Sequence, residues 1–362
     1  MKIAVITCYK YPDYGRAVAL RSGLKANPKI QTIVIKNRYK GVLRYPEVLI
    51  KTFVIHLRQR PDVYLLTFRG YEMLPAILLI ALRKPVILDE LVNPLEVVAE
   101  HRQLYRGKMR GKLMGIWQNL GGLYSWLLRR CKIIIADTSI HAAYSAKISH
   151  VPIERFRAIP VGADEAIFKP IVSTQAKAEE FMVLYYGSMV PLHGLKYVIE
   201  AAEQLKDQPQ ISFLLVGGGD QTAGQVKAAQ ELGANVKYLT WIDPDKLPNF
   251  IADAGLCLGG PFGNTIQSQL VTTGKTYQFM ASAAAVLIGE TKETSANKLF
   301  VDKSNCLMVP QGSSKAIAEA IIWAQAHPAE LKKISQSGNK LYGENFSAGV
   351  ISQKLASLMD EI

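Results

Sequence analysis

Short apolar runs rich in β-branched residues alternate with helical stretches along this chain, and the alternation occurs in two successive series. Strands separated by helices are typical of parallel sheets that are covered by helices. The sequence therefore predicts an α/β fold with two parallel sheets. The expected strands are residues 3–7, 32–35, 63–67, 86–89 and 132–136 in the first series, and 183–186, 212–216, 236–239, 256–258 and 285–288 in the second.

The length of 362 residues is enough for two domains that each have their own core. A polar stretch without strand character follows Pro170 and predicts a linker between them. We expect an N-terminal domain over residues 1–170, a linker over 171–182, a C-terminal domain over 183–342 and a terminal helix over 343–362.

The four cysteines are scattered, with neither a CxxC pair nor a histidine cluster, so the sequence predicts no metal site and no disulfide framework. The longest apolar runs, such as residues 74–82, are shorter than the roughly 20 residues that cross a bilayer. No cleavable signal peptide is recognised at the start of the chain. We expect a cytoplasmic protein.

The net charge of +13 is concentrated in residues 101–132, which carry eight Lys and Arg residues and no Asp or Glu. Trp117, Tyr124 and Trp126 are interleaved with these cations, as in segments that bind anionic membrane surfaces. A solvated basic face with aromatics in the core is an equally good interpretation. Nucleic acid is not expected as a partner, because no nucleic-acid module accompanies the charge.

The stretch LYYGSMVPLHGL, residues 184–195, reads as a strand that stops at Gly187 and a helix that starts after Gly194. Such a turn leaves backbone N–H groups unpaired, and the helix dipole adds partial positive charge. We expect an anion socket here that includes Ser188 and His193. The alternative is a turn that only connects two elements.

Five segments, taken in order, resemble the family 4 retaining glycosyltransferases of the GT-B fold. This resemblance implies two Rossmann-like domains that face each other across a cleft, with a C-terminal helix that crosses back to the N-terminal domain. It also implies a nucleotide-sugar donor, which binds the C-terminal domain. The segments that carry it are residues 133–148, 159–170, 184–202, 213–221 and 273–290.

The resemblance assigns Lys275 to the donor phosphates and Gln278 to the donor ribose, where the family has Glu. Ser188 and His193 stand where the family has Arg and Lys, and Leu270 stands at the other acidic position. Charge-assisted hydrogen bonds are worth roughly 1.5 to 3 kcal/mol each, so two missing ones cost about 3 to 6 kcal/mol. A protonated His193 would restore part of this binding energy.

Further donor contacts are expected from loops at strand ends and from the start of the first helix. Plain turns and helix caps are the alternative for all of them. The glycine-rich stretches complete neither a dinucleotide-binding motif nor a P-loop, so NAD and ATP chemistry are not expected. The expected residues are Gly217 for backbone room, Trp241 near the base, Gly263 and Asn264 near the sugar, and Gly15 with Arg16.

Asp89 and Glu90 end a predicted strand, where ligands bind in open α/β sheets, so they are candidates for the acceptor hydroxyl. Glu96 and His101 lie further along the same loop and are weaker candidates, because charged loop residues are often only solvated.

The sequence thus predicts a retaining hexosyltransferase with Lys275, His193 and Asp89 as catalytic residues. It would move a sugar from a nucleotide-diphosphate donor to an envelope glycan or lipid-linked acceptor, without metal or cofactor. The alternative is a catalytically impaired GT-B relative that acts as a glycan-binding or scaffolding subunit. A nucleotide-sugar epimerase is a weaker interpretation, since it needs a carboxylate or His pair that the sequence does not reveal.

Overall fold

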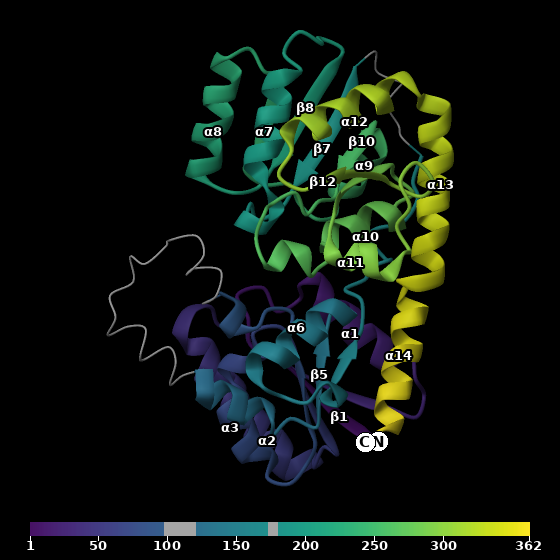
Figure 1. Cartoon of the computed structure of the whole chain (residues 1–362). Coiled ribbons are helices and arrows are strands. Elements are labelled where there is room, and N and C mark those ends of the chain that lie inside the picture. The colour runs from purple at the N-terminus through teal and green to yellow at the C-terminus, as the bar shows by residue number, and fades with distance from the viewer. Residues whose placement is uncertain (98–120, 173–179) are drawn as a thin grey trace. The chain divides into compact units, whose positions relative to one another are not determined.

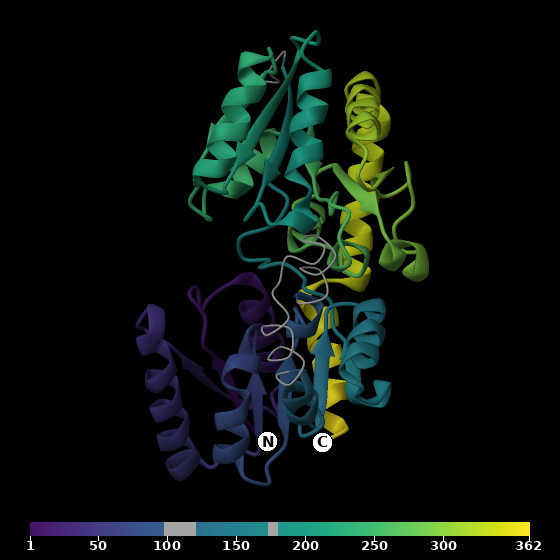
Figure 2. The same ribbon diagram turned by 60° about the vertical axis from the view of Figure 1, so that its left-hand side comes forward.

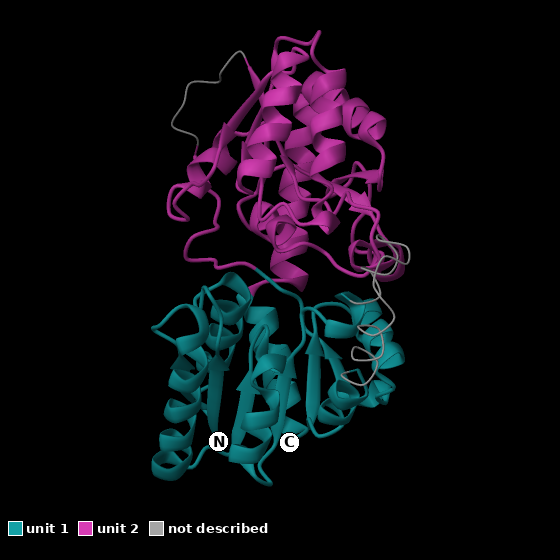
Figure 3. Ribbon diagram, turned by 90° about the vertical axis from the view of Figure 1, so that its left-hand side faces the viewer, with its two compact units in different colours: residues 1–162, 348–362 teal, residues 163–347 magenta. Residues whose placement is uncertain are grey.

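The structure is a computed structural model that describes residues 1–97, 121–172 and 180–362. It divides into two compact units, residues 1–162 with 348–362 and residues 163–347 (Figure 3). The second unit thus begins before the expected boundary at residue 170 and extends beyond the expected end at residue 342. Strand β7 also begins inside the expected linker, at Phe181.

Unit 1 contains a six-stranded parallel sheet with the order β2-β1-β3-β4-β5-β6. Its central strands are continuous apolar runs that are buried on both faces, which is typical of parallel sheets between helices. The strands are β1 (Lys2–Thr7), β2 (Gln31–Lys36), β3 (Val63–Leu66), β4 (Val86–Asp89), β5 (Ile133–Ala136) and β6 (Phe156–Ala158).

Alternate side chains of this sheet belong to two separate cores. Ala4 and Ile6 pack with α2, α3 and α6, whereas Ile3 and Val5 pack with α1 and the C-terminal helix α14. Helices thus cover both faces of the sheet (Figure 2). Residues from the two ends of the chain therefore share one core. The helices are α1 (Gly15–Lys25), α2 (Arg44–Gln59), α3 (Leu74–Ala81), α6 (Ser139–Ser149) and α14 (Ala348–Asp360), and residues 121–128 are also helical.

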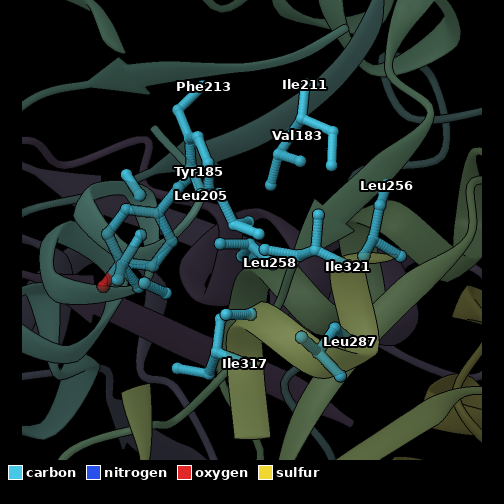
Figure 4. Close-up of a cluster of buried hydrophobic side chains, with 14 of the residues drawn as sticks. Val183, Tyr185, Leu205, Ile211, Phe213, Leu256, Leu258, Leu287, Ile317 and Ile321 are labelled. Carbon is cyan, nitrogen blue, oxygen red and sulfur yellow. The ribbon is translucent and has the colours of Figure 1, made fainter. Parts of the chain in front are cut away.

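Unit 2 contains a second parallel sheet with helices packed around it (Figure 1). It has six strands in the order β12-β11-β10-β7-β8-β9. Side chains of its strands and of α7 and α12 form one buried apolar cluster (Figure 4). The strands are β7 (Phe181–Tyr186), β8 (Ile211–Val216), β9 (Val236–Leu239), β10 (Leu256–Leu258), β11 (Val286–Glu290) and β12 (Leu307–Pro310). The helices are α7 (Leu195–Gln204), α8 (Asp220–Glu231), α9 (Leu247–Asp253), α10 (Gly274–Ala281), α11 (Lys292–Asn297), α12 (Ser314–Ala326) and α13 (Pro328–Asn345).

All ten strands predicted from the sequence are present, and the α/β prediction is confirmed. The structure adds β6 and β12, each at the edge of its sheet. The predicted helical tail, residues 316–362, is observed as α12, α13 and α14, with α14 packed on α1 of unit 1.

Candidate active site in unit 2

The strand order of the second sheet reverses between β7 and β10. From there β8 and β9 extend to one side of β7, and β11 and β12 extend to the other side of β10. In open parallel sheets, ligands bind outside the carboxyl ends of the strands at such a reversal. The loops that follow β7 and β10 contain Gly187, His193, Gly194 and Gly263. The topology therefore brings four predicted donor-site residues to one place.

Glycines allow the backbones of these loops to touch. A Cβ on Gly194, where φ is +68°, would lie 2.5 Å from the Gly263 nitrogen. A Cβ on Gly217, where φ is +104°, would lie 2.2 Å from the Gly187 carbonyl oxygen. Since backbone atoms cannot give way as side chains can, larger residues would separate the loops. The prediction that Gly217 provides backbone room agrees with this geometry.

The prediction that glycine amides form the anion socket is wrong in one respect. The N–H of Gly187 donates to the Val216 carbonyl at 3.0 Å, and the N–H of Gly194 donates to the Pro191 carbonyl at 3.1 Å. Both donors are therefore already paired. These two glycine N–H groups are thus not available to an anion, contrary to the expectation.

Lys275 is the second residue of α10 and is buried. Its Nζ lies 3.8 Å from the centre of the Tyr185 ring and has no hydrogen-bond partner among the residues that the structure describes. Burial holds the pKa of this amine well below its usual range. The ring face compensates a cation only in part, so an anionic ligand would supply the missing partner.

His193 packs over Gly187, with its Cε1 and Nδ1 atoms each 3.4 Å from where a Cβ on Gly187 would lie. Burial, together with the nearby charge of Lys275, lowers the pKa of His193 to about 2. The imidazole is therefore neutral at physiological pH. Protonation of His193 is disfavoured without a ligand, and the negative charge of a bound diphosphate would oppose this effect. The role of a protonated His193 in place of the missing Lys stays a prediction.

Two tyrosines that the sequence reasoning missed contact predicted site residues. The Tyr186 hydroxyl donates to Oε1 of Gln278 at 2.6 Å, and the Tyr185 hydroxyl donates to the His193 carbonyl at 2.8 Å. They are consecutive in β7 and directly precede Gly187. Their position in the LYYG stretch could therefore have identified them as neighbours of the predicted site. Gln278 was predicted to contact the donor ribose, and its Oε1 atom instead accepts a hydrogen bond from Tyr186.

The other donor-side candidates of unit 2 differ in exposure. Ser188 and Asn264 are exposed, and so is Trp241, which follows the edge strand β9. Leu270 is buried, where an unpaired carboxylate would be costly. These side chains lie on the strand-end loops as predicted, and their contacts with a donor stay predictions.

The structure brings Arg16 and Asp89 together in the interior of unit 1. Nε and Nη2 of Arg16 lie 3.1 and 2.8 Å from Oδ1 of Asp89, and both side chains are fully buried. Nη1 of Arg16 donates to the carbonyls of Ile159 and Pro160. The pair connects α1 with β4 and with the turn after β6. The predictions that Arg16 contacts the donor and that Asp89 contacts the acceptor are therefore wrong for this structure, because each charge is paired inside unit 1. Next to Arg16, Gly15 is exposed, and a Cβ there would contact nothing within 4 Å.

Glu90 is also buried, and the hydroxyls of Tyr124 and Ser145 donate to its carboxylate. Burial raises the pKa of Glu90 to about 7, against the lowering effect of those hydrogen bonds. Asn93, on the loop after β4, donates to the Ser145 hydroxyl at 2.8 Å. The residue predicted for the acceptor thus forms part of a buried polar network.

A second pair of contacts extends this network. Nδ1 of His141 lies 2.6 Å from Asp137, and its Nε2 lies 2.8 Å from Glu96. Burial lowers the pKa of His141, but the two carboxylates outweigh it and raise that pKa well above its usual value. Glu96 is therefore a partner of a buried imidazolium rather than a solvated loop residue. His101 lies outside the described residues.

Most of the basic segment 101–132 lies outside the described residues, of which the second stretch begins at residue 121. Tyr124, Leu127 and Leu128 are buried in a core of unit 1. Trp126 is half exposed, and the Arg130 guanidinium stacks 4.2 Å from its ring centre. The core interpretation therefore holds for Tyr124, whereas Trp126 has the exposure that the membrane interpretation expects.

Within the described ranges, no three His, Cys, Asp or Glu side chains are grouped in a way that could hold a metal ion. No helix in that part of the chain combines the length and apolar character needed to cross a membrane.

Residues 180–327 match the sequence model of the family described as Glycosyl transferases group 1. No curated protein sequence matches the chain. Among solved structures, sucrose-phosphate synthase from Thermosynechococcus elongatus is similar with 17% identity and a TM-score of 0.76, covering 100% of this chain and 98% of that one. HepE from Anabaena, in complex with UDP-glucose, is similar with 14% identity and a TM-score of 0.72, covering 100% of both chains.

TarM from S. aureus, crystallised as a variant with UDP and α-GlcNAc-glycerol among its ligands, is similar with 14% identity and a TM-score of 0.62. The similarity covers 87% of this chain and 59% of TarM. At such identities these likenesses establish the fold, which is GT-B with two Rossmann-like domains. The match to the family described as Glycosyl transferases group 1 lies within unit 2.

Proposed function

We propose that this protein transfers a hexose from a nucleotide-diphosphate donor to an envelope glycan or a lipid-linked acceptor, with retention of configuration. The observation that carries the proposal is Lys275, a buried amine beside the strand-order reversal of unit 2 for which the described residues provide no hydrogen-bond partner. HepE, which has a similar fold, has been crystallised with UDP-glucose and with UDP and glucose. A diphosphate would give Lys275 the anionic partner that the protein itself lacks.

In this mechanism the protein stabilises the departing diphosphate electrostatically while the acceptor attacks from the same face of the sugar. Lys275 supplies the charge, and the first turn of α10 adds N–H groups and the positive end of its dipole. Because Nζ of Lys275 is shielded, donor binding includes a displacement of the side chains that cover it. Gln278 exchanges the Tyr186 hydroxyl for the donor ribose. We propose that no metal or cofactor takes part.

Thermal unfolding with a panel of sugar nucleotides tests donor binding directly. A ligand at about 100 times its Kd stabilises the folded state by about 2.7 kcal/mol, which shifts Tm by several degrees. We expect such a shift with one donor class and with its free nucleoside diphosphate. Absence of a shift with every donor would oppose the proposal. With turnover established, the anomeric configuration of the product by NMR tests retention.

The second candidate is a catalytically impaired GT-B relative that binds glycans or acts as a scaffold. It is favoured by the neutral His193 and by Ser188 and Gln278, which replace three charged residues of the family pattern. It predicts no donor turnover with any acceptor, and no gain of activity in the double variant His193→Lys, Gln278→Glu. Activity of the unmodified chain excludes it.

We further propose that the protein is cytoplasmic and binds the inner face of the membrane through the basic segment 101–132. The absence of acidic residues from this segment supports electrostatic attraction to anionic headgroups. Co-sedimentation with anionic but not neutral vesicles, weakened by salt, is expected. Equal recovery of the protein in the soluble fraction with both vesicle types would refute this proposal.

A further inference from the structure

Helix α2 of unit 1 exposes a row of large apolar side chains. Ile50, Phe53, Val54 and Leu57 are 64%, 52%, 38% and 58% exposed. Their spacing of three, one and three residues places them on one face of the helix. In a soluble helix this spacing normally marks the face that packs on the protein core.

The core-facing side of α2 is a different one. Val48 and Thr52 are fully buried, and Leu49 and Ile55 pack against the core of unit 1. The row that begins at Ile50 is therefore a second apolar face, which the described residues of unit 1 leave exposed.

Helix α3 continues this apolar surface. It packs beside α2 in unit 1 (Figure 1), and Leu79 and Leu82 at its carboxyl end are 77% and 76% exposed. Leu57, Leu79 and Leu82 line one open cavity of about 910 Å³. We name the exposed row of α2 together with this cavity the α2–α3 surface.

The α2–α3 surface carries positive charge without acidic partners. Four cations, Arg60, Arg83, Lys84 and Arg130, line the cavity, and among the described residues no Asp or Glu lines it. Arg130 also stacks on the half-exposed Trp126 ring. Cations and an aromatic ring thus surround an apolar centre.

We propose that the α2–α3 surface, to which Arg130 of the basic segment also contributes, docks on a bilayer that contains anionic phospholipids. Apolar side chains of such a surface enter the boundary between headgroups and acyl chains, while its Lys and Arg residues contact the headgroups. A second copy of this chain is a poorer occupant, because a twofold interface would place the four cations against their own copies.

Co-sedimentation of the full-length chain with vesicles tests the apolar part of the surface. Vesicles of phosphatidylcholine are compared with vesicles of equal parts phosphatidylcholine and phosphatidylglycerol. The triple variant Phe53→Ser, Leu57→Ser, Leu79→Ser is expected to bind the anionic vesicles at least about tenfold more weakly. The matched control is Leu232→Ser, Ile322→Ser, which changes exposed apolar residues of unit 2 and is expected to bind as the unmodified chain does.

The cationic part is tested with the triple variant Arg60→Gln, Arg83→Gln, Lys84→Gln. We expect at least about a tenfold loss of binding to anionic vesicles and a weaker dependence on salt. The control is Lys315→Gln, Lys340→Gln on exposed positions of unit 2, and circular dichroism confirms that all variants are folded.

The proposal is overturned if both surface variants bind like the unmodified protein, or if neutral vesicles bind it equally well. It is also overturned if only substitutions within residues 101–112 abolish binding, or if the apolar variant instead abolishes a concentration-dependent dimer. Thermal stabilisation by a sugar nucleotide in solution requires no vesicles. Failure of membrane docking is therefore distinguishable from failure of the transferase proposal.

Discussion

The burial of Lys275 opposes the stability of the folded protein. Its pKa is lowered on folding, so the unfolded chain binds more protons, and the unpaired amine costs stability at every pH below about 10. A residue retained at such a cost is a candidate for ligand binding.

The variant Lys275→Met should separate these two effects. Loss of one charge-assisted hydrogen bond, worth roughly 1.5 to 3 kcal/mol, weakens donor binding about 10- to 150-fold. The ligand-free variant should have a higher Tm, because Met places no amine in the interior. Titration calorimetry and thermal unfolding measure both, with the exposed Lys292→Met as control. A lower Tm together with unchanged affinity would contradict our interpretation.

Glu90 and His141 predict how the stability of unit 1 depends on pH. The folded pKa of Glu90 is raised from 4.5 to about 7, so the folded state binds more protons in that range. The free energy of unfolding should therefore fall by about 3 kcal/mol as pH rises from 4.5 to 7, since one pKa unit is worth about 1.36 kcal/mol. The raised pKa of His141 acts in the same direction, because its contribution is complete below pH 6.5 and is lost above the folded pKa.

Urea unfolding across this pH range tests the assignment. The variant Glu90→Gln keeps hydrogen-bonding groups for Tyr124 and Ser145 but cannot ionise, so it should show a flatter profile and greater stability above pH 7. The exposed Glu154→Gln is the control and should keep the original profile. A Glu90→Gln profile as steep as that of the unmodified protein would rule out Glu90 as a source of the pH dependence.

At the scale of elements, the two strands that the sequence did not reveal are both short and both at sheet edges. β6 has three residues, and one of them is the polar Arg157. β12 has four residues, of which Met308 is partly exposed and Pro310 is exposed. The edge strands β2 and β9 were predicted, so position at an edge is not sufficient to hide a strand. β6 and β12 lack a buried apolar run, and pairing with a neighbour specifies them instead.

Helix α14 should contribute substantially to the stability of unit 1. Leu355 is fully buried, and its Cδ1 would lie 2.8 Å from a Cβ on Gly23 of α1. The variant Leu355→Ala should lower the free energy of unfolding by about 2 to 5 kcal/mol through the cavity that it creates. Chemical denaturation measures this, with the exposed Lys354→Ala as control. A change as small as that of the control would show that α14 is not part of the core.

At the scale of the whole molecule, the candidate donor residues are divided unequally between the units. Most lie on strand-end loops of unit 2, and only Gly15 and Arg16 lie in unit 1. We expect a sugar nucleotide to slow amide hydrogen exchange in residues 187–194 and 259–278. Mass spectrometry of exchanged peptides measures this, and protection of residues 11–16 would support the predicted role of Gly15. Protection confined to unit 1 would contradict the placement of the donor site in unit 2.

The sequence by itself determined the two α/β units, ten strands and the position of the turn between Gly187 and Gly194, because apolar periodicity and turn residues are local properties. Only the tertiary structure decided the environments of the charged candidates. Arg16 and Asp89 pair across 73 positions, Glu96 meets His141, and His193 is neutral beside Lys275. Burial and distance set whether a charge binds a ligand or another side chain, and neither is written in the local pattern of residues.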